Sequence, residues 1–523
     1  MLKHILLCLA LCCVTTISAQ ESWRTDFRHS TDTIASTEHE GADNGAPFRA
    51  MSTTLSNGLG VYGETARGTV ASIGSPRIPV ILVAFADLDF LSENAVEKVS
   101  RWLNEEGYHD ETYAVGSVAD YFRDNSYGLF TPSFDIAAKV TVSQPYAYYG
   151  AHSGSSVDAR AQTLVREAID LAIEQGVDFS SYADDGQLPI VSIIHAGPGE
   201  QEDFGYIYDA TSSDNYIWAH YRSLGYTKED VSIASYIITN ESMRNFDYEG
   251  NVTSTVMTGI GTFCHEFCHS LGLPDTYDVN GAAGGAGQTP GFWDVMDYQF
   301  MLNGYRPGCL NAYERCCLGW LELPELTELS LESIVLAPLD ADNISDGALR
   351  AVRITNPFNP AEHFIFENRQ PSRWHVDCYG NTFILGTGML AWHIDYNASS
   401  WNANSVNTNA SHQRVSVVPA DGVWQSPVFG TEEHYGDLFP GAQHIAAFDA
   451  NVAEFYDGPL TTPLNFITEE ADGSITFYIS KPTYVKSLTS QTYDHHNYDL
   501  QGRPTTQTKG IIINNRNIKI KTH

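Results

Sequence analysis

The chain has 523 residues, of which 43% are hydrophobic and 12% aromatic, so it can bury the cores of roughly two to four domains. Its 64 Asp and Glu outnumber 29 Lys and Arg, and the net charge of −35 argues against nucleic-acid binding, because a phosphate backbone would be repelled. Divalent cations and basic partners suit this charge better. No apolar run reaches the roughly 20 residues that cross a bilayer, so we expect no transmembrane segment.

The N-terminus has the pattern of an export signal. Lys3 is followed by an apolar run, Ile5–Val14, and then by small residues before Gln20. Residues 1–19 are therefore predicted to be a signal peptide, and the protein to be secreted or attached to the cell surface. The next segment, residues 20–75, is rich in small and polar residues with little periodicity, which predicts a leader or pro-segment.

Strand and helix patterns alternate over residues 76–325. Ile78–Phe85 and Leu188–His195 are continuous, largely β-branched apolar runs, as in strands buried on both faces. Between them, Val115–Phe122 and Arg160–Glu174 have the apolar spacing of helices. This order predicts an α/β domain.

After residue 325 the pattern changes to short strands separated by turn residues, which predicts an all-β, sandwich-like region over residues 326–482. The expected strands are Ser333–Ala337, Ala351–Ile354, Phe364–Glu367, Gly388–Asp395, Arg414–Pro419 and Ser474–Ser480. Residues 483–523 form a separate tail with two strand-like runs, Tyr498–Arg503 and Lys509–Lys521. The tail is similar to the end of the sorting domains used by type IX secretion, which implies export machinery as a partner; a plain terminal hairpin is the alternative.

A metal-binding pattern lies in the α/β domain. His265 and His269 are four residues apart, so on a helix both imidazoles reach one metal ion, and Glu266 stands beside its open position. Gly272 permits the left-handed turn that ends the helix, and the chain then bends back to present Asp275 as the third ligand. We expect the ion to be Zn²⁺, which raises the acidity of a water while Glu266 takes the proton and passes it to a leaving amine.

Two further points concern the helix of this motif and its third ligand. Upstream, Thr255–Phe263 has few charges and is predicted to be the first part of the same helix. Glu314, in a later helical stretch, is the alternative third ligand.

A methionine follows the motif in an aromatic segment. Met296 alone would be read as a core residue, but after an extended H-E-x-x-H motif it resembles the methionine turn beneath the zinc of metzincin peptidases. Tyr298 matches the position at which some metzincins have a tyrosine that stabilises the oxyanion, and a packed core tyrosine is the alternative.

Taken together, these motifs resemble the immune inhibitor A-like family of secreted bacterial zinc metallopeptidases, over about residues 76–480. Further matching blocks are Ser117–Gly128, His195–Gly197, Ile217–His220, Pro307–Trp320, Glu367–Arg369, Gly388–Asp395, Ala420–Gly422 and Leu438–Gly441.

The resemblance implies an α/β (α+β), metzincin-like catalytic domain followed by the β-rich region. It implies an endopeptidase that cuts proteins or peptides outside the cell. His265, His269 and Asp275 would be the zinc ligands, Glu266 the general base, and Met296 the floor of the site. Tyr298 would be a second catalytic residue.

Two other functions remain open from the sequence. A secreted binding protein or adhesin would keep the zinc for structure only, but such a site has no use for Glu266, a carboxylate beside the ligands. A zinc hydrolase that acts on glycans or small peptides is the third hypothesis.

Other polar groups suggest further sites. Calcium is a second expected cation, with Asp184–Gly186 and the acidic cluster Glu200, Glu202, Asp203 and Asp209 as candidates, although exposed loops would look the same. His195 and His220 either line the cleft or are buried structural residues. His393 and Asp395 share one face of a strand, where an ordinary hydrogen-bonded pair is expected.

The predicted leader and the cysteines bear on how the site would be kept inactive. Residues 20–75 are expected to block the cleft until they are removed. No cysteine of the mature chain precedes Cys264, so an acidic residue such as Asp26, Asp32 or Asp43 would have to block the metal. Cys264 and Cys268 flank the motif, and disulfides or apolar packing are expected for them rather than metal binding.

Overall fold

The computed structural model describes residues 68–479, with gaps at 112–113, 154–157, 203–214, 248–250, 281–288, 298–303, 330–332, 376–385 and 424–435, and four short strands within 497–521. The chain divides into two compact units, Met1–Ile479 and Ser480–His523. The predicted signal peptide, residues 20–67 of the predicted leader, Tyr298 and Cys378 lie outside the described residues.

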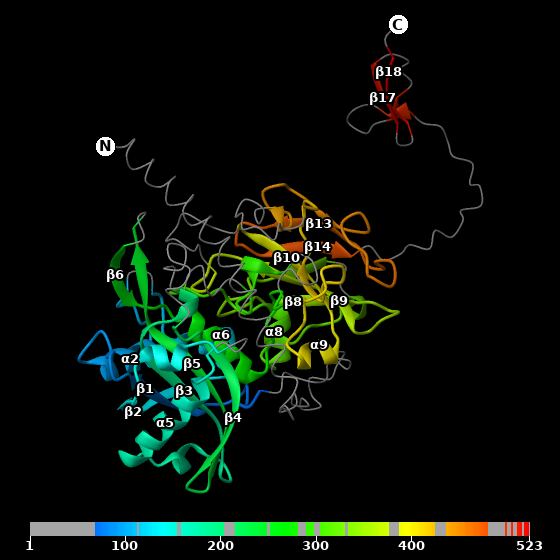
Figure 1. Cartoon of the computed structure of the whole chain (residues 1–523). Coiled ribbons are helices and arrows are strands. Elements are labelled where there is room, and N and C mark those ends of the chain that lie inside the picture. The colour runs from blue at the N-terminus through cyan, green and yellow to red at the C-terminus, as the bar shows by residue number, and fades with distance from the viewer. Residues whose placement is uncertain are drawn as a thin grey trace, which may run out of the picture. The chain divides into compact units, whose positions relative to one another are not determined.

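The first unit contains a sheet with the strand order β2-β1-β3-β5-β4, and β6 also pairs with β5 (Figure 1). β1, β2, β3 and β5 run parallel, whereas β4 and β6 are antiparallel to β5. The strands are β1 (Arg77–Ala84), β2 (Ser133–Thr141), β3 (Gln187–Pro198), β4 (His220–Lys228), β5 (Val231–Phe246) and β6 (Val252–Met257).

Side chains that alternate along β1 divide this sheet between two hydrophobic clusters. Val80 and Leu82 belong to a cluster with residues of α2, α3 and α6, while Ile81 and Val83 belong to a second cluster with residues of α4 and α5. Helices thus cover both faces, and the predicted α/β arrangement is confirmed. The helices are α2 (Ala95–Asn104), α3 (Val118–Asn125), α4 (Tyr146–Gly150), α5 (Ala161–Glu174) and α6 (Gly261–Leu271).

The helix that carries the metal-binding pattern begins later than the sequence predicts. Residues up to Met257 form β6, which pairs with β5 from Ser242 onward, so the prediction of a helix over Thr255–Phe263 is wrong for its first part. The run Val-Thr-Ser-Thr-Val is rich in β-branched residues, which favour a strand when a partner strand is present. α6 starts at Gly261, whose N–H donates to the Gly304 carbonyl at 2.6 Å.

Two antiparallel sheets form the β-rich part, as the sequence predicts. Their strand orders are β11-β10-β9-β8 and β12-β13-β14-β7, and a third hydrophobic cluster contains residues of both. The strands are β7 (Ser333–Leu336), β8 (Ala351–Thr355), β9 (Glu362–Arg369), β10 (Gly388–Asp395), β11 (Val415–Val417), β12 (Ala447–Phe448), β13 (Leu464–Glu469) and β14 (Ile475–Ile479).

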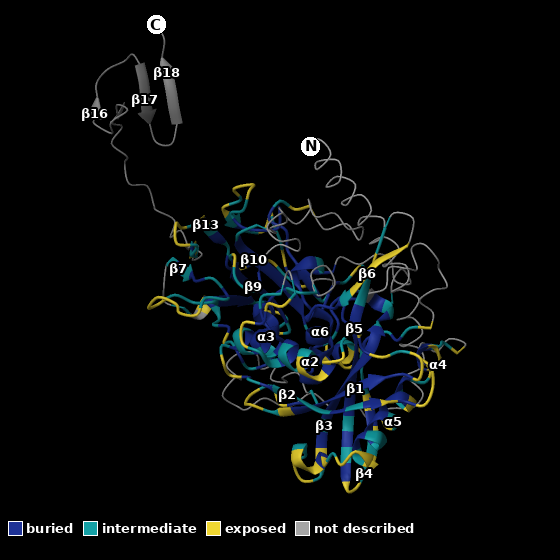
Figure 2. Ribbon diagram, turned by 90° about the vertical axis from the view of Figure 1, so that its left-hand side faces the viewer, coloured by how far each residue is buried: buried dark blue, intermediate teal, exposed yellow. Residues whose placement is uncertain are grey.

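The first of these sheets is also packed against the α/β part. Every residue of β9 and β10 is buried (Figure 2). Ile365 and Trp392 belong to the same hydrophobic cluster as Phe263 and Phe267 of α6, whereas their strand neighbours belong to the cluster between the two β-sheets. The β-rich part therefore forms one side of the environment of α6.

The end of the predicted leader packs on the C-terminal turn of α6. The Gly68 N–H donates to the Leu271 carbonyl at 3.2 Å, and the Val70 N–H donates to the Ser270 carbonyl at 3.0 Å. Both carbonyls belong to the last turn of the helix, where no intrahelical donor is left. Val70 is buried, and the Trp320 indole N–H donates to the Ser72 carbonyl at 2.6 Å. Residues 68–75 are thus part of the packed α/β structure.

The second unit contains a small sheet with the order β16-β15-β17-β18. β17 (Gly510–Asn514) and β18 (Asn517–Lys521) form an antiparallel pair, and the other strands are β15 (Asn497–Tyr498) and β16 (Pro504–Thr505). Among the described residues of both units, none of the helices combines the length and the apolar character that crossing a bilayer requires.

The contact between residue 68 and α6 predicts the effect of one added methyl group. A Cβ atom at Gly68 would lie 1.8 Å from the Ser270 carbonyl oxygen. We expect Gly68→Ala to lower the free energy of unfolding by about 1–3 kcal/mol, because the segment must move away from the helix. Ile73→Ala is the control: Ile73 is 54% exposed in the same segment, and a change within about 0.5 kcal/mol is expected. Denaturant unfolding measures both, and equal stabilities would contradict the packing described.

Candidate metal centre

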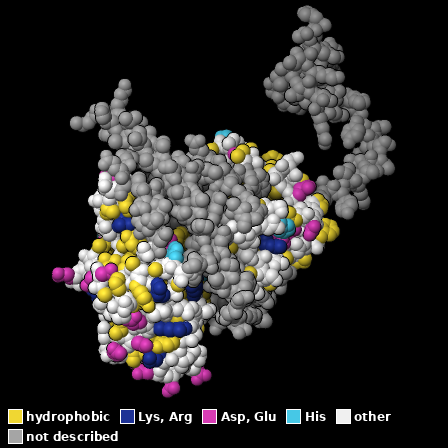
Figure 3. Space-filling model, in the orientation of Figure 1, with side chains coloured by type: hydrophobic (Ala, Val, Ile, Leu, Met, Phe, Trp, Pro, Cys, Tyr) yellow, Lys and Arg dark blue, Asp and Glu magenta, His cyan; other side chains and the backbone are white. Residues whose placement is uncertain are grey.

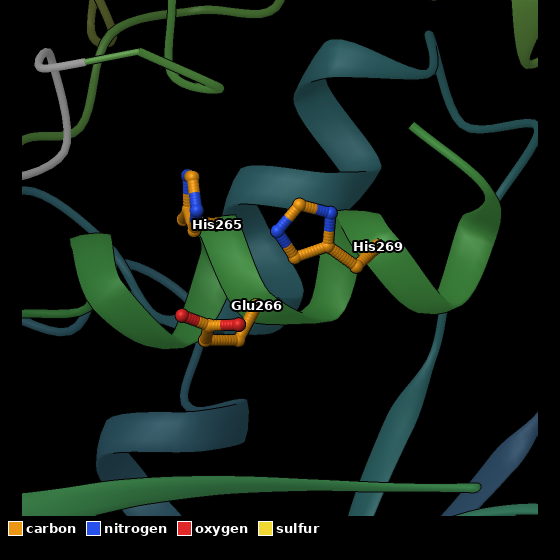
Figure 4. A group of neighbouring side chains, drawn as sticks. All are labelled: His265, Glu266 and His269. Carbon is orange, nitrogen blue, oxygen red and sulfur yellow. The ribbon is translucent and has the colours of Figure 1, made fainter. Parts of the chain in front are cut away.

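Helix α6 places two imidazoles side by side. His265 and His269 lie one turn apart, with ring centroids separated by 4.9 Å, and Figure 4 shows both with Glu266 on the same helix. The helix ends at Gly272, which has the left-handed φ of 102°, and its N–H donates to the carbonyls of Cys268 and His269. The chain therefore leaves the helix as the sequence predicts.

Backbone carbonyls fix the orientation of both rings. Nδ1 of His265 lies 2.9 Å from the Val295 carbonyl oxygen, and Nδ1 of His269 lies 2.7 Å from that of Leu273. A carbonyl oxygen only accepts hydrogen bonds, so each Nδ1 carries a proton, and each neutral ring has its lone pair on Nε2. Both lone pairs are then available to a cation.

The carboxylate of Asp275 meets the two Nε2 atoms. Its Oδ1 lies 3.2 Å from each of them, and this buried oxygen accepts no hydrogen bond from the described residues. Three ligand atoms around a tetrahedral zinc, at distances of about 2.1 Å from the ion, would be separated by about 3.4 Å. The donor set and its spacing thus fit a zinc ion, and the predicted return of the chain toward the helix brings Asp275 to the predicted place.

The carboxylate of Asp275 and the imidazoles of His265 and His269 affect one another's ionisation strongly. Although burial opposes ionisation of Asp275, the His269 and His265 imidazoles hold the pKa of its carboxyl well below the usual range. Burial also opposes protonation of His269, but Asp275 outweighs it and raises the pKa of His269 to about 9. A cation bound by these atoms would therefore compete with a proton.

Glu266 lies beside these groups. One of its carboxylate oxygens is within 4.8 Å of ligand atoms of His265 and His269, and the residue is 6% exposed. Burial raises the pKa of its carboxyl, and the backbone N–H of Tyr221 in β4 donates a hydrogen bond to it. The carboxylate therefore faces the histidines from a position in contact with an edge strand of the sheet.

The segment that contains Met296 supports both sides of the centre. Met296 is fully buried, its carbonyl accepts the Thr276 N–H at 2.9 Å, and the preceding Val295 carbonyl orients His265. Glu314 is elsewhere: it belongs to the capping box of α8 (Ala312–Cys317). The predicted oxyanion tyrosine, Tyr298, lies outside the described residues.

A residue that sequence reasoning missed contacts Asp275. Asn404, 129 residues further along, donates from Nδ2 to Asp275 Oδ2 at 2.6 Å and accepts the Asp275 N–H on Oδ1 at 2.7 Å. It follows α9 (Ala398–Asn402) in the β-rich part, with a left-handed φ of 49° that Asn tolerates better than most residues. The sequence around Asn404 contains no local pattern that indicates this contact.

Asp203 and Asp209 of the predicted calcium cluster lie outside the described residues, and the other histidines singled out in the sequence and the Asp184 turn lie away from the centre. Burial lowers the pKa of His195 to about 4 and that of His220 to about 3, so both are neutral residues inside the fold, and His220 Nε2 lies 2.8 Å from Tyr236 Oη. His393 pairs with Glu362, and Asp395 with His412 and Arg414, not with each other. The Asp184 N–H closes a turn with the Gln187 carbonyl.

The cysteines beside the histidines are free thiols. Cys264 and Cys268 are fully buried in the hydrophobic cluster of α6, and burial raises the pKa of both well above its ordinary value. They therefore stay protonated and pack as small apolar side chains.

The helix and its neighbours define the class of H-E-x-x-H metallopeptidases, and comparison with known proteins gives a similar family. Residues 68–313 match the family model described as immune inhibitor A peptidase M6, catalytic domain. Pre-pro-metalloprotease PrtV of Vibrio cholerae serotype O1 is 29% identical over 244 residues, which are 42% of this chain and 26% of that protein. Immune inhibitor A of Bacillus thuringiensis subsp. alesti is 25% identical over 258 residues, 42% of this chain and 36% of that protein.

Residues 68–313 are thus similar to the catalytic domain of the immune inhibitor A family of metallopeptidases, as the sequence motifs indicate. The aligned part covers well under half the length of these relatives.

The contact between Asn404 and Asp275 predicts a change in metal affinity. We expect Asn404→Gly, which preserves the left-handed backbone, to weaken zinc binding about 10–100-fold, as is typical when a hydrogen-bond partner of a ligand is lost. Asn402→Gly, a change of an exposed asparagine two residues earlier, is the matched control and should leave the affinity unchanged. Competition with a chromogenic chelator measures both, and equal affinities would show that Asn404 does not hold the carboxylate.

Proposed function

We propose that this protein is a secreted zinc metalloendopeptidase that hydrolyses peptide bonds of extracellular proteins. The observation that carries the proposal is the convergence of His265 Nε2, His269 Nε2 and Asp275 Oδ1 beside the buried Glu266. These three side chains would be the zinc ligands. The family match of residues 68–313 supports the reaction class.

Glu266 would act as the general base. When bound, zinc would polarise the substrate carbonyl and lower the pKa of a water at its open position. Glu266 would accept the proton of this water and pass it to the leaving amine, and its raised pKa makes it a better base than an exposed glutamate. The Tyr221 N–H would hold the carboxylate in place during the transfer.

The metzincin-like details are part of the same proposal. Met296 would provide the apolar floor under the ion, and Tyr298 would donate to the oxyanion. Asp275 is a harder, anionic ligand than the histidine found at this position in most metzincins, so it would leave the water less acidic.

Secretion and latency are proposed on the same basis. The N-terminal pattern of residues 1–19 supports export, and the name of one relative, a pre-pro-metalloprotease, supports a leader and a pro-segment before the domain. The tail would serve export or surface attachment. On the face in Figure 3, Lys and Arg side chains are scattered among acidic and apolar ones, which agrees with substrates other than nucleic acid.

A secreted binding protein with a structural zinc is the weaker alternative. A structural site is usually closed by four protein ligands, whereas here three ligand atoms converge and a fourth group, Glu266, stands beside them. This arrangement favours catalysis.

The role of Glu266 predicts a separation of metal binding from activity. Glu266→Gln should keep one equivalent of zinc at this centre and lose about 10²–10⁴-fold in hydrolysis of a denatured protein, because the base is removed and the ligands stay. A chelator should abolish wild-type activity, and added zinc should restore it. Near-normal activity of the variant with full zinc content would refute the proposed mechanism.

The identity of the third ligand has its own test. We expect Asp275→Ala to weaken zinc binding far more than Asp278→Ala, a change of the half-buried carboxylate three residues later. Zinc content is measured after dialysis, with circular dichroism as the check on folding. If Asp275→Ala keeps its zinc and a folded Glu314→Ala loses it, the assignment of the third ligand is wrong.

A further inference from the structure

A second group of potential cation ligands lies in the α/β part. It consists of His152, which follows α4, Asp158, which precedes α5, and Glu200 in the short helix η4 (Glu200–Glu202) after β3. One ligand atom from each side chain lies within 4.8 Å of the others, and His152 Nε2 is 3.4 Å from Glu200 Oε2. Three segments that are far apart in the sequence thus bring an imidazole and two carboxylates together.

The carboxylate of Asp158 carries the inference furthest. The residue is only 3% exposed, and its Oδ2 accepts the Trp218 N–H at 2.9 Å. Its Oδ1 is buried and accepts no hydrogen bond from the part of the chain that the structure describes. A buried carboxylate oxygen without a donor is costly unless a cation or a proton satisfies it. Here the adjacent groups are a second carboxylate and an imidazole, which are the usual ligands of a divalent ion. The charge of Arg222 in β4 also acts on the Asp158 carboxylate and lowers its pKa, against the larger effect of burial.

We propose that His152, Asp158 and Glu200 bind a second divalent metal ion of the transition series, Zn²⁺ or Mn²⁺. An imidazole ligand favours these ions, whereas Ca²⁺ prefers a shell made of oxygen atoms. Two carboxylates also balance the charge of one divalent ion. The His152 side chain is 30% exposed and that of Glu200 is 12% exposed, so the ion can enter from solvent while Asp158 closes the inner side.

This ion binds where the chain enters β4. The Glu200 N–H donates to the Ile217 carbonyl at 3.0 Å, Asp158 accepts the Trp218 N–H, and Gln201 accepts the Ala219 N–H at 3.0 Å. Two residues further on, the Tyr221 N–H donates to Glu266.

The second ion therefore stabilises the strand that holds the proposed catalytic base, without belonging to the first centre. Its role is structural.

The experiment is a count of bound metal in five proteins. All carry Glu266→Gln to prevent self-digestion, and zinc is measured after equilibration with buffered Zn²⁺ and gel filtration. We expect two equivalents in the parent, one in Asp158→Asn, one in His269→Ala and none in the double variant. Glu174→Gln, an exposed carboxylate at the end of α5, is the control and should keep two equivalents.

The same series separates this proposal from the proposed function. Loss of one equivalent only in His269→Ala overturns the second site and leaves the first intact. Retention of two equivalents in His269→Ala refutes the first centre and leaves the second standing. If Asp158→Asn does not fold, the more exposed variants Glu200→Gln and His152→Gln replace it, each expected to weaken the second equivalent at least tenfold.

Two further readouts address the ion and its role. Mn²⁺ titration followed by electron paramagnetic resonance should show a site that Glu200→Gln removes, and a site filled by Ca²⁺ but by neither Zn²⁺ nor Mn²⁺ would overturn the assignment. Occupancy should also raise the thermal midpoint of the parent but not that of Glu200→Gln. An equal rise in both would show that the ion acts elsewhere.

Discussion

The burial of α6 on all sides constrains most of the structure around it. All of its residues except His269 are buried, yet the helix carries two imidazoles and a carboxylate, and its last carbonyls need donors. Each polar group is satisfied by a different segment: Val295 and Leu273 orient the rings, and Gly68 and Val70 supply donors to the helix end. The polar groups of this helix thus determine where several loops must pass.

The same constraint explains why the β-rich part packs against the α/β part. β9 and β10 are buried on both faces, because one face closes the cluster between the two β-sheets and the other covers the helix layer. From this sheet's side of the molecule, Asn404 reaches the carboxylate of Asp275. A region that resembles an appended module in the sequence therefore contributes to the candidate metal centre.

Local features of the sequence predicted what depends on local geometry. The spacing of His265 and His269, and the glycine that ends the helix, follow from the period of an α-helix and from the conformational freedom of Gly272. The apolar runs of β1 and β3 predicted the parallel sheet. By contrast, the start of α6 was misjudged, because whether Thr255–Met257 forms strand or helix depends on the pairing partner β5. Asn404 was missed since a hydrogen bond over 129 residues has no local signal.

The long-range contact between Asn404 and Asp275 affects when the candidate centre is completed during synthesis. When α6 has just been made, the segments with the Val295 carbonyl and Asn404 have not yet been synthesised, so the His265 ring and the Asp275 carboxylate lack their supporting contacts. The full set of contacts can form only after more than three quarters of the chain has been produced. A nascent or truncated chain that ends before residue 404 carries every residue of the H-E-x-x-H motif but not the complete geometry, which delays assembly of the centre until late in folding.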